Sequence, residues 1–176
     1  MSLQEKDSIA SPDRQVDIRD YAPRRDREDV IRCVAALQDF ERSLEPNLPP
    51  GERIARRYVE AMLQRCTAYE GRVFVAVAEQ RVVGFVCVLA RIPETAADDF
   101  ARPHAAIGEL FVDAELRGVG VGKRLLQRAE EYALKRGATR LRVQVLADNT
   151  VARALYSGFG FRDRLVELER QLGAED

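Results

Sequence analysis

The stretch Arg117-Gly118-Val119-Gly120-Val121-Gly122 lies between the end of an apolar segment and the start of an amphipathic one. Its glycines allow the backbone to turn tightly and leave successive N–H groups unobstructed. The amphipathic segment that follows is predicted to be a helix, and a helix N-terminus carries about half a positive charge. Backbone donors next to a helix N-terminus form a binding site for anions. The stretch is therefore predicted to bind phosphate groups, and a pyrophosphate is the ligand that suits it best.

Three phosphate-binding motifs compete for this stretch. A P-loop requires Gly-x-x-x-x-Gly-Lys followed by Ser or Thr, but Arg117 stands in place of its first glycine and Arg124 in place of the hydroxyl. A dinucleotide-binding fingerprint requires Gly-x-Gly-x-x-Gly in the first βα turn of the fold, and here the third glycine comes one residue early and deep in the chain. The third motif has the form Arg/Gln-x-x-Gly-x-Gly/Ala. Arg117, Gly120 and Gly122 match it.

In carrying this third motif, the chain resembles the GNAT superfamily of N-acetyltransferases, whose acyl-CoA pyrophosphate site has that form. The resemblance runs from about Val73 to Phe161. The segment before the motif, residues 108–113, resembles the superfamily's splayed central strand, whose backbone pairs with the pantetheine arm of CoA. Residues 149–161, which end in Gly-Phe-Gly-Phe, resemble its second conserved region. Each piece alone is ordinary, but their order and spacing are specific.

The resemblance implies that acetyl-CoA is the acyl donor, that no metal takes part, and that an amine attacks the thioester directly. Backbone N–H groups near Phe111 and Val112 are expected to stabilise the tetrahedral oxyanion. For Lys123 a solvated helix face, and for Asn149 a helix cap, are competing explanations. The donor site is expected to consist of Leu110, Phe111, Val112, Arg117, Gly118, Val119, Gly120, Val121, Gly122, Lys123 and Asn149.

Two catalytic residues are proposed from the resemblance and from the strand pattern. Tyr156 stands where many members place a phenol near the departing sulfur, and because a tyrosine pKa of about 10 exceeds a thiol's of about 8.5, we expect hydrogen-bond donation to the thiolate. A lysine-like amine arrives protonated, so a proton acceptor is needed. Glu109 is the candidate, because it is the ionisable side chain of the predicted strand at 107–112 and alternation places it opposite Leu110 and Val112.

Each catalytic assignment has an alternative. For Tyr156 it is a core side chain in the pattern of its helix, and for Glu109 it is an edge carboxylate paired with an arginine. The family often has an acidic residue one position earlier, where this chain has Gly108. A chain of waters that relays the proton to solvent therefore stays open as a substitute for a dedicated base.

The hydrophobic pattern agrees with an α/β (α+β) fold in a single domain over residues 15–176, preceded by a disordered lead-in at 1–14. The resemblance implies a mixed, mostly antiparallel sheet of six to seven strands, flanked by about four helices and splayed between the fourth and fifth strands. The pattern predicts strands near 16–21, 73–78, 82–90, 107–112 and 141–146, helices over 26–44, 54–66, 121–133 and about 150–158, a loop at 92–104, and one or two closing strands in 161–172.

Composition excludes several classes of function. The formal net charge of the 176 residues is only -1, with 46% apolar and 32% charged residues, so neither a nucleic-acid binder nor a membrane-surface protein is favoured. No apolar run approaches the roughly 20 residues that cross a bilayer, and a cytoplasmic protein is expected. The three cysteines are odd in number and form no C-x-x-C, so neither a disulfide framework nor a zinc site is predicted.

The acceptor is the least defined part of the prediction. The regions that form the acceptor cleft in the family are rich in acids, which favours a small cationic amine over a protein N-terminus or lysine, although arginines lie among them. A rival function is a catalytically silent acyl-CoA-binding regulatory module. Residues 165–172 are apolar at alternate positions and predict pairing with a second subunit in a homodimer. The acids in question are Asp39, Glu41, Glu45, Glu52, Glu94, Asp98 and Asp99.

Overall fold

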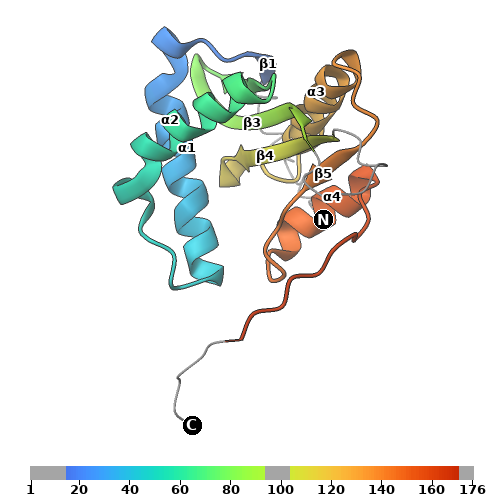
Figure 1. Cartoon of the computed structure of the whole chain (residues 1–176). Coiled ribbons are helices and arrows are strands. Elements are labelled where there is room, and N and C mark those ends of the chain that lie inside the picture. The colour runs from blue at the N-terminus through green and yellow to red at the C-terminus, as the bar shows by residue number, and fades with distance from the viewer. Residues whose placement is uncertain (1–14, 94–103, 171–176) are drawn as a thin grey trace, which may run out of the picture.

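The computed structural model describes residues 15–93 and 104–170, in which a five-stranded sheet is covered by helices on both faces (Figure 1). Helices α1 and α2 cover one face, and α3 and α4 cover the other. The elements in chain order are β1 (Asp17–Asp20), α1 (Pro23–Leu44), α2 (Gly51–Ala68), β2 (Arg72–Ala78), β3 (Arg81–Ile92), β4 (His104–Val112), a 3-10 turn (Ala114–Leu116), α3 (Val121–Lys135), β5 (Leu141–Val143) and α4 (Thr150–Phe159).

The strands lie side by side in sequence order, from β1 to β5. The first four are antiparallel to one another, whereas β5 runs parallel to β4. This last pairing is short, because β5 contacts β4 only from Ala105 to Ile107. Beyond Ile107 the two strands separate, and the rest of β4 has a strand partner on one side only. The predicted mixed, mostly antiparallel sheet, splayed between its fourth and fifth strands, is confirmed.

The sheet separates two hydrophobic cores, and the alternation of β2 shows how. Phe74 and Ala76 pack in the core beneath α3 and α4, while Val73 and Val75 pack in the core beneath α1 and α2. A strand that is buried on both faces needs apolar residues at every position, because successive side chains point to opposite faces. The continuous apolar runs of β2 and β3 therefore predicted correctly that this hairpin forms the middle of the sheet.

The sheet has fewer strands than the six or seven predicted. Residues 161–170 form no strand, and Leu165, Val166 and Leu168 are 80%, 74% and 90% exposed. The segment extends away from the body of the domain (Figure 1). Alternating apolar residues stabilise a strand only when a neighbouring strand satisfies the backbone and covers one face. Within the described chain the adjacent edge strand, β5, is only three residues long.

Some predictions fall on residues that lie outside the described ranges. They are the disordered lead-in at 1–14, most of the loop at 92–104 with its acids Glu94, Asp98 and Asp99, and the last positions of the predicted closing strands. Among the residues that are described, no helix is both long enough and apolar enough to span a membrane.

Candidate active site

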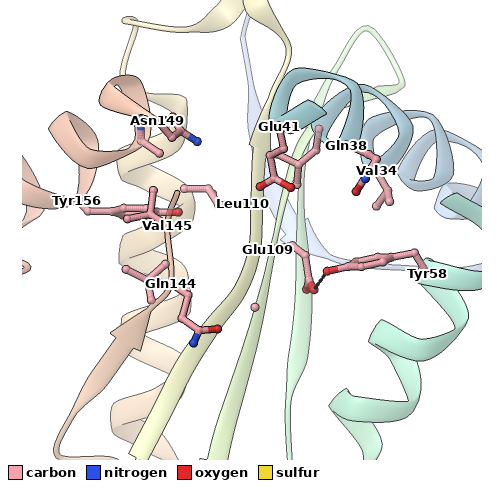
Figure 2. A pocket seen from close by; sticks show the side chains of 14 residues that line it. Val34, Gln38, Glu41, Tyr58, Glu109, Leu110, Gln144, Val145, Asn149 and Tyr156 are labelled. Carbon is pink, nitrogen blue, oxygen red and sulfur yellow. Dashed lines mark hydrogen bonds between the residues drawn. The ribbon is translucent and has the colours of Figure 1, made fainter. Parts of the chain in front are cut away.

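A pocket opens where β4 separates from β5, between α1 and α2 on one side and α4 on the other (Figure 2). It brings together residues that are more than 120 positions apart in the chain, from Val34 to Tyr156. Two of its lining residues are carboxylates and two are tyrosines, among otherwise apolar and amide side chains. The lining consists of Val34, Leu37, Gln38, Glu41, Tyr58, Gly108, Glu109, Leu110, Val143, Gln144, Val145, Asn149, Ala152 and Tyr156.

A β-bulge at Gly108 decides which way the central strand aims its carboxylate. Cys87 of β3 lies opposite Glu109, and the next residue of β3 lies opposite Ile107, so Gly108 is the extra residue of β4. An unbroken strand would place Ile107 and Glu109 on the same face. Instead, Ile107 packs in the core beneath α3, and Glu109 bonds to side chains of α2. The bulge thus turns Glu109 toward the cleft between α2 and the sheet.

Glu109 is a buried carboxylate with one occupied and one free oxygen. Its exposed fraction is only 5%. The Tyr58 hydroxyl donates to Oε1 at 2.8 Å, and Arg65 forms an ion pair with the same oxygen. Oε2 is also buried but has no hydrogen-bond partner among the described residues. Since a buried unpaired oxygen is costly, this atom marks a place where a ligand donor would be stabilised.

Glu41 is the second carboxylate of the pocket, and it comes from α1. It follows Val34 and Gln38 on the same helix face, at the spacing of successive turns. No side-chain hydrogen bond or ion pair of Glu41 is found within residues 15–93 and 104–170. Burial, and then the negative charge of Glu109, raise the pKa of Glu41. In Figure 2 Glu41 extends from α1 toward β4, on the same side of the pocket as Glu109.

Tyr156 lies on α4, on the other side of the pocket. Its ring is 8% exposed and packs edge-on against Phe161, with ring centroids 5.6 Å apart. The hydroxyl has no partner among the described residues, and the side chain lines the pocket. Burial, followed by the charge of Glu41, raises the pKa of Tyr156 to about 12. The core role and the site role that the sequence left open are therefore compatible, because the ring packs while the residue borders the pocket.

The glycine-rich loop before α3 has the backbone geometry of an anion site. Gly118 and Gly120 have φ angles of +79° and +90°, and a Cβ at either would meet nothing within 4 Å, so the conformation itself requires glycine. Residues 117–120 are exposed. Among the described residues, no backbone carbonyl accepts from the N–H groups of positions 118–120. These donors precede the N-terminus of α3 directly.

Gly122 is needed for a different reason. A Cβ there would lie 3.1 Å from Cδ2 of Leu155, so this glycine allows α3 and α4 to approach closely. The residue before it, Val121, is 2% exposed and belongs to the core, which leaves only its backbone for a ligand. The loop itself is not part of the pocket lining. The motif therefore combines two positions required by φ with one required by packing.

The charged residues around the loop have distinct orientations. The Arg117 guanidinium lies over the ring of Phe40 in α1, 5.3 Å from its centroid, and its Nε donates to the Val112 carbonyl. Lys123 is exposed in the first turn of α3. Arg124 turns away from the loop and donates to the Val16 carbonyl beside β1. Lys123 is thus available to a phosphate ligand, whereas Arg117 and Arg124 each already donate to a backbone carbonyl.

Asn149 is the N-cap of α4, as one of its two interpretations predicted. Its Oδ1 accepts from the Ala152 N–H at 3.0 Å, and the residue is 7% exposed. It nevertheless lines the pocket, with Leu110 on the facing strand. Phe111 and Val112 pack into the two cores on opposite faces of β4. Four predicted site residues, Glu109, Leu110, Asn149 and Tyr156, therefore meet in one pocket.

The sequence did not single out the α2 partners of Glu109. Tyr58 and Arg65 are seven residues apart, which places them two turns apart on one face of α2. They lie 51 and 44 positions from Glu109 in the chain, so only the tertiary structure reveals the contact.

The sequence also did not predict a contact between two cysteines. Sγ of Cys66 in α2 lies 3.4 Å from Sγ of Cys87 in β3. No set of three His, Cys, Asp or Glu side chains in the described ranges is arranged to hold a metal ion.

Comparison with known proteins agrees with this architecture. The chain matches the model of the acetyltransferase (GNAT) family over residues 34–161. It is 31% identical to an uncharacterized N-acetyltransferase of Archaeoglobus fulgidus over 140 residues, which cover 79% of this chain and 90% of that protein. It is 34% identical to an uncharacterized N-acetyltransferase of Methanocaldococcus jannaschii over 113 residues, 64% of this chain but only 47% of the relative's length.

A solved structure has the same fold at lower sequence identity. It is AAC(6')-Iy in complex with the bisubstrate analog CoA-S-monomethyl-acetylneamine, with a TM-score of 0.63 and 20% identity over 90% of this chain and 99% of that one. The family model covers most of the chain, and the archaeal relatives carry the name of the enzyme class that the sequence predicts. The chain therefore belongs to the acetyltransferase (GNAT) family.

Proposed function

We propose that this protein transfers an acetyl group from acetyl-CoA to the primary amine of a small cationic acceptor. The observation that carries the proposal is the junction of two half-sites along β4. One is the glycine-rich loop with its exposed N–H groups. The other is the acidic pocket beside the part of β4 that has no β5 neighbour. A donor with a pyrophosphate and an extended arm suits the first half-site, and a cationic amine suits the second.

The donor half-site has a strand edge as well as an anion loop. From Gly108 onward β4 has no β5 neighbour, so part of its backbone is available to an amide-containing arm. Arg117 and Lys123 stand beside the loop and supply positive charge toward phosphates. The arm would then run from the loop along the edge toward Leu110, which places a terminal thioester near the pocket.

The chemical step is a direct attack. The amine nitrogen forms a bond to the thioester carbonyl carbon, and collapse of the tetrahedral intermediate breaks the bond from that carbon to sulfur. The Tyr156 hydroxyl donates a hydrogen bond to the departing thiolate. Its pKa, raised to about 12 by burial and by Glu41, keeps the phenol protonated near neutral pH. We expect backbone N–H groups in the part of β4 that has no β5 neighbour to stabilise the oxyanion.

Glu109 is the proposed acceptor of the amine's proton. An alkyl ammonium must lose a proton before its nitrogen can attack. Oε1 of Glu109 is occupied by Tyr58 and Arg65, so Oε2 is the atom that is free to receive it. The proton then passes to solvent through the pocket opening. The two donors on Oε1 hold the carboxylate in place while Oε2 faces the reacting group.

The preference for a small cationic acceptor rests on charge and on fold similarity. Both carboxylates of the pocket lie on the side formed by α1, α2 and β4. The bisubstrate analog bound to AAC(6')-Iy, a protein of the same fold, joins CoA to an acetylneamine. Acetylation of a protein N-terminus or of a lysine side chain is the competing acceptor class.

The test combines the purified protein with acetyl-CoA and a panel of small amines, lysine peptides and peptides with free N-termini. Thiol release and the mass of the acetylated product are both measured. Thiol release with small cationic amines, together with a mass gain on the amine that matches one acetyl group in place of one hydrogen, is the expected result. Acetyl-CoA binding without release for any acceptor would favour the silent regulatory module. Absence of binding would overturn the proposal.

We also propose that the extended segment 161–170 contacts a second copy of the chain. Leu165, Val166 and Leu168 are exposed on a segment with strand-like composition, and a second subunit would cover them. Sedimentation velocity is expected to give a dimer for the intact protein and a monomer for Leu168→Glu. A monomeric intact protein at all concentrations would refute this assignment.

A further inference from the structure

The two carboxylates of the pocket differ in how their charge is balanced. Glu109 is paired with Arg65 and hydrogen-bonded by Tyr58. Glu41 has neither an ion-pair partner nor a side-chain hydrogen bond among the described residues. The charge of Glu109 is therefore compensated within the protein, whereas that of Glu41 is available for a ligand.

The proton balance of acetyl transfer indicates which cation Glu41 binds. The reacting nitrogen must be neutral when it attacks, so it cannot serve as a lasting partner for a carboxylate. A second ammonium group on the same acceptor stays charged before, during and after the reaction. Such a group needs a permanent anion, and Glu41 is the pocket carboxylate that has no ion-pair partner among the described residues.

Glu41 also lines the same pocket as both proposed catalytic groups, Glu109 and Tyr156. Its charge acts on Tyr156 in α4, and the charge of Glu109 acts on Glu41. It therefore lies within electrostatic reach of both proposed catalytic groups. The other titratable groups facing the pocket are Tyr58, Glu109 and Tyr156, with Arg65 behind Glu109. Glu41 and Glu109 thus line one cavity.

We infer that Glu41 selects acceptors that carry a second positive charge, such as a diamine or polyamine, by binding the ammonium group that does not react. This inference rests on the proposed function and names its substrate class. Glu109 then serves the reacting amine, and Glu41 holds the distal one. Glu41 is a specificity-determining residue in this division and takes no proton itself.

Calorimetric binding tests the inference without turnover. The acceptors are a series of α,ω-diamines with two to six carbons and the matched monoamines, each titrated into the protein saturated with CoA. The intact protein is expected to bind at least one diamine about tenfold more tightly than its monoamine, because a charge-assisted hydrogen bond is added. Glu41→Gln is expected to reduce that ratio to within about twofold of one, and Glu41→Asp to restore part of it.

Glu45→Gln is the matched control, because Glu45 is an exposed acid that directly follows the end of α1, four residues beyond Glu41, and does not line the pocket in the structure. It is expected to keep the diamine preference. A second readout excludes a purely structural role for Glu41. Since burial and Glu109 raise the pKa of Glu41, its ionised form costs stability above that pKa. Glu41→Gln should therefore unfold at a higher temperature than the intact protein at pH 7, and this gain should vanish at pH 4.

Equal binding of diamines and monoamines by the intact protein would overturn the inference, as would a diamine preference that survives in Glu41→Gln. Thiol release is measured in parallel. Diamine selectivity in binding with no thiol release for any amine would refute the proposed acetyl transfer while supporting the role of Glu41. Thiol release at equal kcat/KM for both acceptor types, without selective binding, would support the proposed acetyl transfer and refute the role of Glu41.

Discussion

The two sides of the cleft offer a ligand different kinds of group. On the donor side the groups are backbone N–H donors of residues 118–122 and of the unpaired part of β4, held by glycine conformations and by the start of α3. On the acceptor side they are the side chains of Glu41, Tyr58 and Glu109, which come from two helices and a strand. A backbone site is specified by a short local motif, whereas a side-chain site depends on contacts between distant segments.

The two kinds of site should respond differently to changes in the sequence. A backbone site for a pyrophosphate tolerates changes in the surrounding side chains, because the N–H groups are present in every residue type except proline. We expect the acceptor pocket to change its preference with a single charge. Substitutions in the glycine-rich loop should therefore weaken acetyl-CoA binding. Substitutions in the acidic pocket should instead lower the turnover of the acceptor.

The largest effect is expected at the acceptor side from Glu109→Gln. The amide cannot accept the proton of the attacking amine, and kcat should fall by about a thousandfold, within the range for loss of a general base. The dissociation constant of acetyl-CoA should stay within about twofold, because Glu109 faces α2 and not the glycine-rich loop. A decrease in kcat of less than threefold would instead support a water relay.

Tyr156→Phe should lower kcat by about a hundredfold, because the thiolate loses its hydrogen-bond donor. The ring is retained, so the contact with Phe161 and the folded state should be kept. Steady-state kinetics against the intact protein measure the effect, with thermal unfolding as the check on the fold. An unchanged kcat, with the chemical step shown to be rate-limiting, would leave Tyr156 with its packing role alone.

Gly120→Val should weaken acetyl-CoA binding by about tenfold, because a β-branched residue is strained at a φ of +90°. Gly158→Ala is the matched control, since its position in α4 has open space and an ordinary φ. Calorimetric titration compares the two variants. If both bind acetyl-CoA like the intact protein, the loop does not hold the pyrophosphate.

The smallest effect concerns the alkaline side of the pH profile. The pKa of Tyr156 is raised to about 12 by burial and by Glu41, so the phenol stays protonated as the pH rises to 10. We therefore expect kcat, at saturating acceptor, to change less than twofold between pH 8 and pH 10. A fall in this interval that is absent in Tyr156→Phe would show that the phenol ionises earlier.

The backbone geometry of the glycine-rich loop was predictable from the sequence, whereas the side-chain contacts of the acidic pocket were not. The positive φ angles of Gly118 and Gly120 are a local requirement, so the motif itself carries the information. The ion pair of Glu109 with Arg65 joins residues 44 positions apart, and no local pattern encodes it. Gly108 looked like a missing carboxylate in the sequence, whereas in the structure it is the bulge that turns Glu109 toward α2.

The fold was predictable for the same kind of reason, with one exception. The apolar runs of β2 and β3 and the helical spacing of α1 to α3 determine their own elements and the layers between them. The closing strands predicted in 161–172 failed because an alternating pattern records that a segment is compatible with a sheet, and not that a partner strand is available to it. Residues 161–170 have the pattern but no partner in the described chain.

Calorimetric titration of the purified protein with acetyl-CoA, and separately with NAD, tests the central claim most directly. The loop, the unpaired edge of β4 and the mixed sheet predict that acetyl-CoA binds and that NAD does not. Binding of NAD, or no binding of acetyl-CoA, would contradict the assignment of the glycine-rich loop to an acyl-CoA pyrophosphate.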